Sequence, residues 1–215
     1  MIRPYTLIAI AACAVSATFS YRAGADSAPI SEAASETVDG AAEAVFAGGC
    51  FWCVESDFDK VDGVLSTVSG YTGGRSDNPT YKTHGVDGHY EAVRVSYDPT
   101  IVTYDELVEY FWRHVDPTDA GGQFCDRGDS YRTAIFVADD AQRNIAEASK
   151  DALESSGVLG LPVVTPVEEL GEFWPAETYH QDYYLKNPVR YKFYRTSCGR
   201  DRRVDQVWAN ATPES

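Results

Sequence analysis

The sequence predicts an α+β fold: a ferredoxin-like β-α-β-β-α-β core with a mixed or antiparallel sheet, extra helices and an irregular C-terminal segment. Three observations support this class. Segments 64–71 and 90–97 alternate between apolar and polar residues, as half-buried strands do. Segment 103–115 places its apolar residues on one helical face. The chain is 44% hydrophobic and 13% aromatic, which suits one globular domain with a sizeable core.

The first half of the predicted core begins with a short apolar strand over residues 44–47. Gly48-Gly49 then permits a sharp turn into a helix that starts at Cys50 and ends near residue 59. Strand 64–71 stops before Gly73-Gly74, and strand 90–97 stops before Asp98-Pro99. Residues 74–89 between these two strands form an insertion with no regular pattern.

The second half of the core begins with a helix that Thr103 and Glu106 start as a capping box. A strand is expected over residues 133–138, followed by a helix that Asp139 caps and that ends near Gly157. In chain order, the first six elements give the split β-α-β arrangement. The last expected elements are a strand at 161–167, a short helix at 178–186 and a basic, aromatic tail around 190–203.

The first 25 residues resemble a signal peptide. Arg3 supplies the positive start, residues 5–19 are almost wholly apolar or small, and Ala23-Gly24-Ala25 matches the cleavage pattern. We therefore expect an exported protein, periplasmic or secreted. The alternative is a lipid anchor on Cys13, within a segment that resembles a lipobox. The further divisions expected are a flexible linker at 26–42, the catalytic domain at 43–210 and a tail at 211–215.

The formal net charge is −15, which repels nucleic acid and anionic lipid. We therefore expect no nucleic-acid partner, and membrane association only if Cys13 is lipidated. No dinucleotide-binding or flavin motif is apparent in the sequence, so no cofactor is expected.

The most informative string is the run from Gly48 to Cys53, Gly-Gly-Cys-Phe-Trp-Cys, at the junction of strand and helix. A thiol at a helix N-terminus faces unpaired N–H groups and the positive end of the helix dipole, and both favour the nucleophilic thiolate. Cys53 lies three residues further and is close enough to react with Cys50. This pattern predicts a redox-active cysteine.

Three alternatives to that prediction remain open. The Cys-x-x-Cys pair could bind zinc with His84, His89 or Cys198, although no second such pair completes the site. The cysteines could instead be structural staples, one within the Cys-x-x-Cys pair and one joining Cys125 to Cys198. The order of strand, Cys-x-x-Cys and helix is also that of thioredoxin-type oxidoreductases, although no Trp precedes the first cysteine.

Several separate motifs resemble, in order, those of the peptide methionine sulfoxide reductase A family, and they span residues 46 to about 198. The first is Gly49-Cys50-Phe51-Trp52. Two positions depart from the family: Tyr90, where Ala is common, and Cys53, where many members have Gly. The other motifs are Gly70-Tyr71-Thr72-Gly73-Gly74, Asn78-Pro79-Thr80-Tyr81, Gly88-His89-Tyr90-Glu91-Ala92-Val93, Asp116-Pro117-Thr118, Asp126-Arg127-Gly128 with Tyr131-Arg132, and Tyr179-His180-Gln181-Asp182-Tyr183.

The resemblance implies reduction of methionine-S-sulfoxide, free or in proteins, as a repair after oxidative damage. Cys50 would attack the sulfoxide sulfur, and Glu91 would protonate its oxygen as a buried acid of raised pKa. Tyr81, Asp126 and Tyr131 would hold the oxygen and orient the acid.

The resemblance also implies how the substrate is held and how the enzyme is recycled. Phe51 and Trp52 would pack against the methyl group on the substrate sulfur. The sulfenic acid formed on Cys50 would condense with Cys198, whose pKa Arg195 and Arg200 would lower, or alternatively with Cys53. Cys125 is expected to be a buried apolar residue. A thioredoxin-like reductant outside the cytoplasm would reduce the resulting disulfide, and we expect the enzyme to be a monomer.

Overall fold

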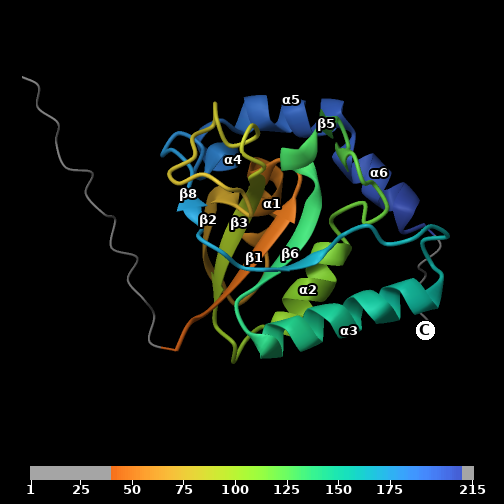
Figure 1. The fold of residues 1–215 in the computed structure, drawn as a ribbon. Coiled ribbons are helices and arrows are strands. Elements are labelled where there is room, and N and C mark those ends of the chain that lie inside the picture. Colours follow the sequence, from red (N-terminus) through yellow and green to blue (C-terminus); the bar gives the residue numbers. More distant parts are fainter. Residues whose placement is uncertain (1–39, 210–215) are drawn as a thin grey trace, which may run out of the picture. The chain divides into compact units, whose positions relative to one another are not determined.

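The computed structural model of the protein describes residues 40–209, so the predicted signal peptide, nearly all of the predicted linker and the tail lie outside the described residues. Its main sheet has the strand order β7-β6-β1-β3-β2-β8. The strands are β1 (Ala42–Gly48), β2 (Val64–Thr72), β3 (Tyr90–Tyr97), β6 (Thr133–Val137), β7 (Val167–Glu169) and β8 (Trp174–Pro175). Figure 1 shows the sheet at the centre of the molecule.

The predicted α+β class and the order of the core elements are confirmed. The chain passes through β1, α1, β2, β3, α2 and β6, and β1 lies between β3 and β6. The pairs that join these four strands are antiparallel, whereas β6 and β7 pair in parallel, so the sheet is mixed. This order brings the end of β1 beside β3, where Glu91 lies.

The three helices of the core form where the sequence predicts them: α1 (Phe51–Phe58), α2 (Tyr104–Trp112) and α3 (Asp140–Ser156). The capping box at the start of α2 is complete, with Thr103 and Glu106 exchanging hydrogen bonds. Asp139 caps α3 by accepting from the Gln142 N–H at 2.8 Å, and Gly157 ends it with a left-handed φ of 64°.

The strands separate two apolar clusters because successive side chains point to opposite faces of a sheet. Phe46, Val93 and Ile135 pack into the larger cluster with residues of α1 and α2. Val45 and Phe136 belong to the smaller cluster on the other face. Glu91 and Ala92 are neighbours in β3, so their side chains point to opposite faces of the sheet. Because Ala92 belongs to the smaller cluster, Glu91 lies on the face that α1 covers.

The segment between α2 and β6 contains short elements that the sequence did not indicate. They are the strands β4 (Gly122–Gln123) and β5 (Asp126–Arg127), which pair with each other, and the 3-10 helix η1 (Asp129–Tyr131). Elements of two or three residues are too short to show a period of apolar residues.

The predicted irregular C-terminal segment is wrong in one respect, because most of it is helical. After α4 (Tyr183–Lys186) come α5 (Pro188–Cys198) and α6 (Arg200–Val207). Figure 1 shows α5 at one end of the strands and α3 at the other. Contacts with α1 hold α5 in place: Tyr191 packs against Cys53, and Arg195 pairs with Asp57 at 2.8 Å. Within residues 40–209 no helix is long and apolar enough to cross a membrane.

The strand predicted over residues 161–167 is also wrong, since β7 begins only at Val167. Pro162 and Pro166 lack the N–H group that a strand ladder needs. The segment still follows the sheet, because the Ile135 N–H donates to the Pro166 carbonyl at 3.0 Å.

Candidate active site

One small cavity of about 60 Å³ collects most of the residues singled out from the sequence. Helix α1, strand β3, the 74–89 insertion and the β5–η1 segment each contribute to its wall. The residues that line it are Cys50, Phe51, Trp52, Tyr81, Glu91, Asp126, Tyr131 and Tyr194. All except Tyr194 were expected at the site.

The turn before α1 places Cys50 at the N-cap of the helix. Gly49 adopts a left-handed φ of 83°, and a Cβ atom there would lie 2.6 Å from the Gln123 Cβ atom. Only glycine therefore fits this turn without displacing Gln123. The close packing holds the turn before Cys50 against Gln123 of β4.

The Cys50 thiol is buried, with 7% of the residue exposed. Burial raises its pKa well above the ordinary value, and Cys53 and Glu91 raise it further, while a hydrogen bond with Tyr194 lowers it. The expected preference for the thiolate at this helix N-terminus is therefore outweighed in the resting protein, because desolvation is the larger effect.

Glu91 lies on β3 opposite Tyr71 and is 1% exposed. Burial raises the pKa of its carboxyl to about 8, against the lowering effect of the hydrogen bond from Phe51. That bond joins the Phe51 N–H to Glu91 Oε2 at 3.0 Å. At neutral pH the carboxyl therefore holds a proton beside the Cys50 thiol, which is the state that a general acid needs.

Two tyrosines from different segments present hydroxyl groups to the cavity. Burial raises the pKa of Tyr81 and of Tyr131, so both hydroxyls keep their protons and can donate. The Tyr81 N–H donates to Glu177 at 3.0 Å, which anchors the insertion that was not assigned from the sequence. The third predicted oxygen partner, Asp126, has a pKa raised by burial.

The apolar side of the cavity is formed by Phe51 and Trp52. The Trp52 indole stacks on Tyr183 with ring centres 3.7 Å apart, and its Nε1 donates to His180 Nδ1 at 3.1 Å. The sequence placed His180 and Tyr183 in a motif but predicted no role for either residue. Their contacts with Trp52 arise only in the folded chain, which brings residue 180 beside residue 52. Tyr90, the departure from the family pattern, packs in the cluster on the opposite face of the sheet.

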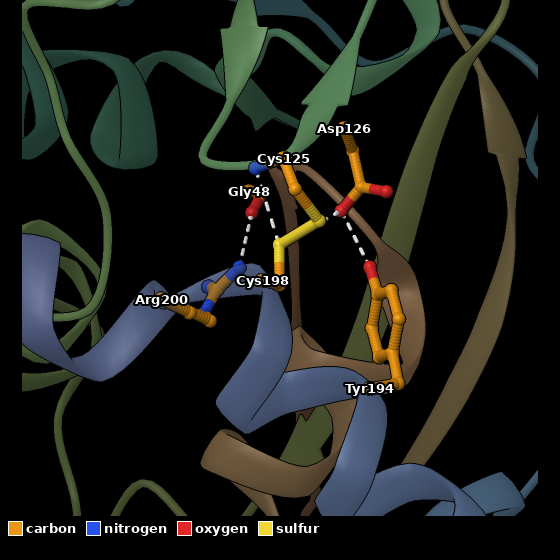
Figure 2. The surroundings of a disulfide bond; sticks show 6 residues. All are labelled: Gly48, Cys125, Asp126, Tyr194, Cys198 and Arg200. Atoms are coloured by element: carbon orange, nitrogen blue, oxygen red, sulfur yellow. Dashed lines mark hydrogen bonds between the residues drawn. A yellow bond between two sulfur atoms is a disulfide. The ribbon is translucent and has the colours of Figure 1, made fainter.

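The four cysteines of the described chain form two different pairs. Cys50 and Cys53 are free and buried, whereas Cys125 and Cys198 are joined by a disulfide bond, which Figure 2 shows. The expectation that Cys125 is a buried apolar residue is wrong: it is exposed and bonded. One of the two staples weighed as an alternative is therefore present.

The environment of Cys53 differs from what the sequence indicated. Its pKa is lowered by its hydrogen bond with Cys50 and by the charges of Arg200 and Arg195, although burial opposes them. The two arginines that were expected to activate Cys198 thus act on Cys53. Helix α5 ends at Cys198, but Arg195 and Arg200 point back to α1, as their contacts with Asp57 show.

The zinc alternative gains no geometric support. Among residues 40–209, three potential metal ligands come together only at Cys125, Asp126 and Cys198, and the two cysteines are bonded to each other. His89 is directed elsewhere, with its Nε2 3.0 Å from the Ser76 carbonyl oxygen.

Comparison with known proteins gives a consistent result. Residues 42–212 match the family model of peptide methionine sulfoxide reductase. The peptide methionine sulfoxide reductase MsrA 2 of Rhizobium meliloti is 55% identical over 167 residues, which cover 78% of this chain and 83% of that protein. The peptide methionine sulfoxide reductase MsrA of Bacillus licheniformis is 50% identical over 173 residues, which cover 80% and 96%.

Solved structures show the same fold. Methionine sulfoxide reductase A of Corynebacterium diphtheriae superposes with a TM-score of 0.62 at 36% identity, covering 70% of this chain and 76% of that one. The reduced form of Mxr1 from Saccharomyces cerevisiae superposes with a TM-score of 0.64 at 30% identity, covering 70% and 88%.

Proposed function

The chain belongs to the peptide methionine sulfoxide reductase family, and on that premise we propose that Cys50 and Glu91 together reduce methionine-S-sulfoxide to methionine. The observation that carries this assignment is their meeting in one cavity: a buried thiol beside a carboxyl whose pKa of about 8 keeps it protonated. Nucleophile and acid are the two groups that this reduction requires.

In the first step, the Cys50 sulfur attacks the sulfoxide sulfur and Glu91 gives a proton to the sulfoxide oxygen. Tyr81 and Tyr131 donate hydrogen bonds to that oxygen as it gains negative charge. The hydroxyl group then moves from the substrate sulfur to the Cys50 sulfur as the S–O bond and the new S–S bond break, so that methionine leaves and Cys50 becomes a sulfenic acid. The substrate sulfur is reduced by two electrons and the Cys50 sulfur is oxidised by two.

In the second step, we propose that Cys53 rather than Cys198 condenses with the sulfenic acid. The thiol of Cys53 displaces water and forms a Cys50–Cys53 disulfide. Two observations favour Cys53: it lies in the first turn of α1, whose N-cap is Cys50, and its pKa is lowered by interaction with Cys50 and with nearby arginines. The sulfur of Cys198 is already bonded to Cys125.

A dithiol protein of thioredoxin type completes the cycle. Its two thiols reduce the Cys50–Cys53 disulfide by thiol–disulfide exchange and leave as a disulfide themselves. Because both cysteines are buried, this exchange requires α5 or the segment before it to yield to the reductant.

The place of action is proposed from the sequence alone. The signal-like first 25 residues favour export to an oxidising compartment, with a lipid anchor on Cys13 as the alternative. Free methionine sulfoxide and oxidised proteins are both proposed substrates, and repair after oxidative stress is the proposed purpose. A monomer suffices for this chemistry, because one chain supplies every residue of the cavity.

Turnover of the two methionine sulfoxide epimers with a small dithiol reductant tests the assignment. We expect turnover of the S epimer alone and its complete loss in Cys50→Ser. Activity of Cys50→Ser above the background of the reductant would overturn the role of Cys50. Equal turnover of both epimers would overturn the stereochemical assignment.

A comparison of two cysteine variants tests the resolving residue. With a thioredoxin as reductant, Cys53→Ala should release methionine in a single turnover and then stop, whereas Cys198→Ser should continue to turn over. The reverse pattern would return the resolving role to Cys198.

A further inference from the structure

Tyr194 of α5 is the one lining residue of the cavity that neither the sequence motifs nor the chemistry above uses. Its hydroxyl donates to Asp126 Oδ2 at 2.5 Å, as Figure 2 shows. Its ring meets the Trp52 indole edge-on, with centroids 5.9 Å apart. The ring and the hydroxyl are thus fixed separately, so the hydroxyl has a defined place beside Cys50.

The Tyr194 side chain lines the same small cavity as the Cys50 side chain, and hydrogen bonding to Tyr194 lowers the pKa of the Cys50 thiol. Two of the backbone N–H groups at the start of α1 are already used: the Phe51 N–H binds Glu91, and the Cys53 N–H binds the Cys50 carbonyl. The helix N-terminus therefore has fewer free N–H groups to stabilise a thiolate, and side chains supply part of that stabilisation. Of the two side chains that interact with the Cys50 thiol in this way, Tyr194 lowers its pKa, whereas Cys53 raises it.

Three interactions keep α5 in this position. The helix ends at Cys198, whose disulfide bond with Cys125 ties it to the residue before Asp126. The Cys125 N–H donates to the Cys198 sulfur at 3.1 Å. Beyond the helix, Arg200 donates to the Gly48 carbonyl at 3.0 Å, just before the turn that carries Cys50. Figure 2 shows these contacts around the disulfide.

We propose that Tyr194 is a further catalytic residue, which relays the thiol proton of Cys50 to Asp126. The Cys50 S–H bond breaks as its proton moves to the Tyr194 oxygen, while the Tyr194 hydroxyl proton moves to Asp126 Oδ2. The products are a Cys50 thiolate, a neutral tyrosine that now donates to it, and a neutral Asp126 carboxyl. This inference rests on the proposed role of Cys50 as the nucleophile.

The chemistry of Asp126 suits this acceptor role. Its carboxylate is half-buried, and burial raises its pKa, which makes it a better base than an exposed aspartate. Glu91 gives its proton to the sulfoxide oxygen while Asp126 still holds the proton that came from the thiol. Transfer of that proton from Asp126 to Glu91 then restores the resting state of both carboxyl groups. No proton is gained or lost over the first step.

Other titratable groups also face Cys50. They are Cys53 from α1, Glu91 from β3, Tyr81 from the insertion and Tyr131 from η1. Cys53 is the one that competes with Tyr194 as hydrogen-bond partner of Cys50, so it must be removed before the effect of Tyr194 is measured.

The test is the pH dependence of Cys50 alkylation by iodoacetamide in Cys53→Ala protein, with and without Tyr194→Phe. Loss of the hydroxyl should raise the midpoint by about one pH unit, which is a tenfold loss of thiolate at neutral pH. The single-turnover rate of methionine release should fall about tenfold with it. Tyr184→Phe is the matched control, because Tyr184 also donates to a carboxylate, Asp59, but lies outside the cavity.

An unchanged midpoint in Tyr194→Phe, or an equal shift in Tyr184→Phe, would overturn the inference. Asp126→Asn gives a second measurement if the tyrosine variant folds poorly: it should slow single turnover similarly, and the double variant should be no slower than either single one. Additive losses would contradict a shared relay. Activity in Cys50→Ser would instead refute the proposed function itself, so the two failures are distinguishable.

Discussion

At the scale of single residues, Glu91 decides the pH range of the reaction. Its carboxyl must be protonated to act, and its pKa is about 8, so the acid form predominates below that pH and is lost above it. We expect the single-turnover rate to fall as pH rises through about 8. A rate that continues to rise with thiolate formation well above that pH would contradict this role.

Replacement of the acid gives a second residue-scale prediction. Glu91→Gln should lower the rate of methionine release by a factor of about 10² to 10⁴, because the oxygen loses its proton donor, and the decline above pH 8 should disappear. Glu168→Gln is a suitable control, since Glu168 accepts from Tyr90, whose ring packs on the opposite face of the sheet. Equal losses in both variants would indicate a structural effect rather than proton donation.

The individual site residues differ in how far the sequence could predict them. The motifs indicated Cys50, Glu91 and Tyr131 because each lies in a run of matching residues. Tyr194 was not predicted because it lies in none of those motifs. Its place in the cavity depends on where α5 packs. The ionisation of Cys50 was also mispredicted, because desolvation is a property of the folded surroundings and not of helix position alone.

At the scale of elements, the turn that starts α1 is tightly constrained. Gly49→Ala should destabilise the fold more than Gly88→Ala, although both glycines have a left-handed φ, because only position 49 also meets a neighbouring side chain. We expect an additional loss of about 1–3 kcal/mol in the free energy of unfolding, measured by denaturant titration. Equal losses would show that Gln123 moves aside at no cost.

The disulfide between Cys125 and Cys198 gives a prediction for α5. It closes a loop with a sequence separation of 73, so Cys125→Ser should lower the free energy of unfolding by about 2–4 kcal/mol. Wild-type protein reduced at this bond should be equally destabilised. A variant as stable as the oxidised protein would show that the bond contributes nothing to holding α5.

The predicted and observed elements agree best where local signals are strong. Helix α2 was expected because it has a capping box and an apolar face, and α3 because a capping aspartate and a terminal glycine mark its ends. Helix α5 has no side-chain cap, and contacts with distant residues hold it: Tyr191 packs against Cys53, Arg195 pairs with Asp57, and Cys198 is bonded to Cys125. Such long-range contacts are not visible in a single sequence.

At the scale of the whole molecule, the order of elements was predictable because each core strand and helix carried its own pattern. The sheet order then follows from the ferredoxin-like connection of those elements, which brings β3 beside β1 and so places Glu91 near Cys50. The edges of the sheet were not predictable: β7 and β8 are short, and prolines interrupt the segment before β7.

Trapping of the sulfenic acid shows directly whether the Cys50 sulfur takes the oxygen from the substrate. Cys53→Ala protein is treated with a slight excess of methionine-S-sulfoxide and a reagent specific for sulfenic acids, and the modified residue is located by mass spectrometry. We predict a single adduct on Cys50 and an equal amount of methionine released. Methionine release with Cys50 unmodified, or an adduct on another cysteine, would contradict the account.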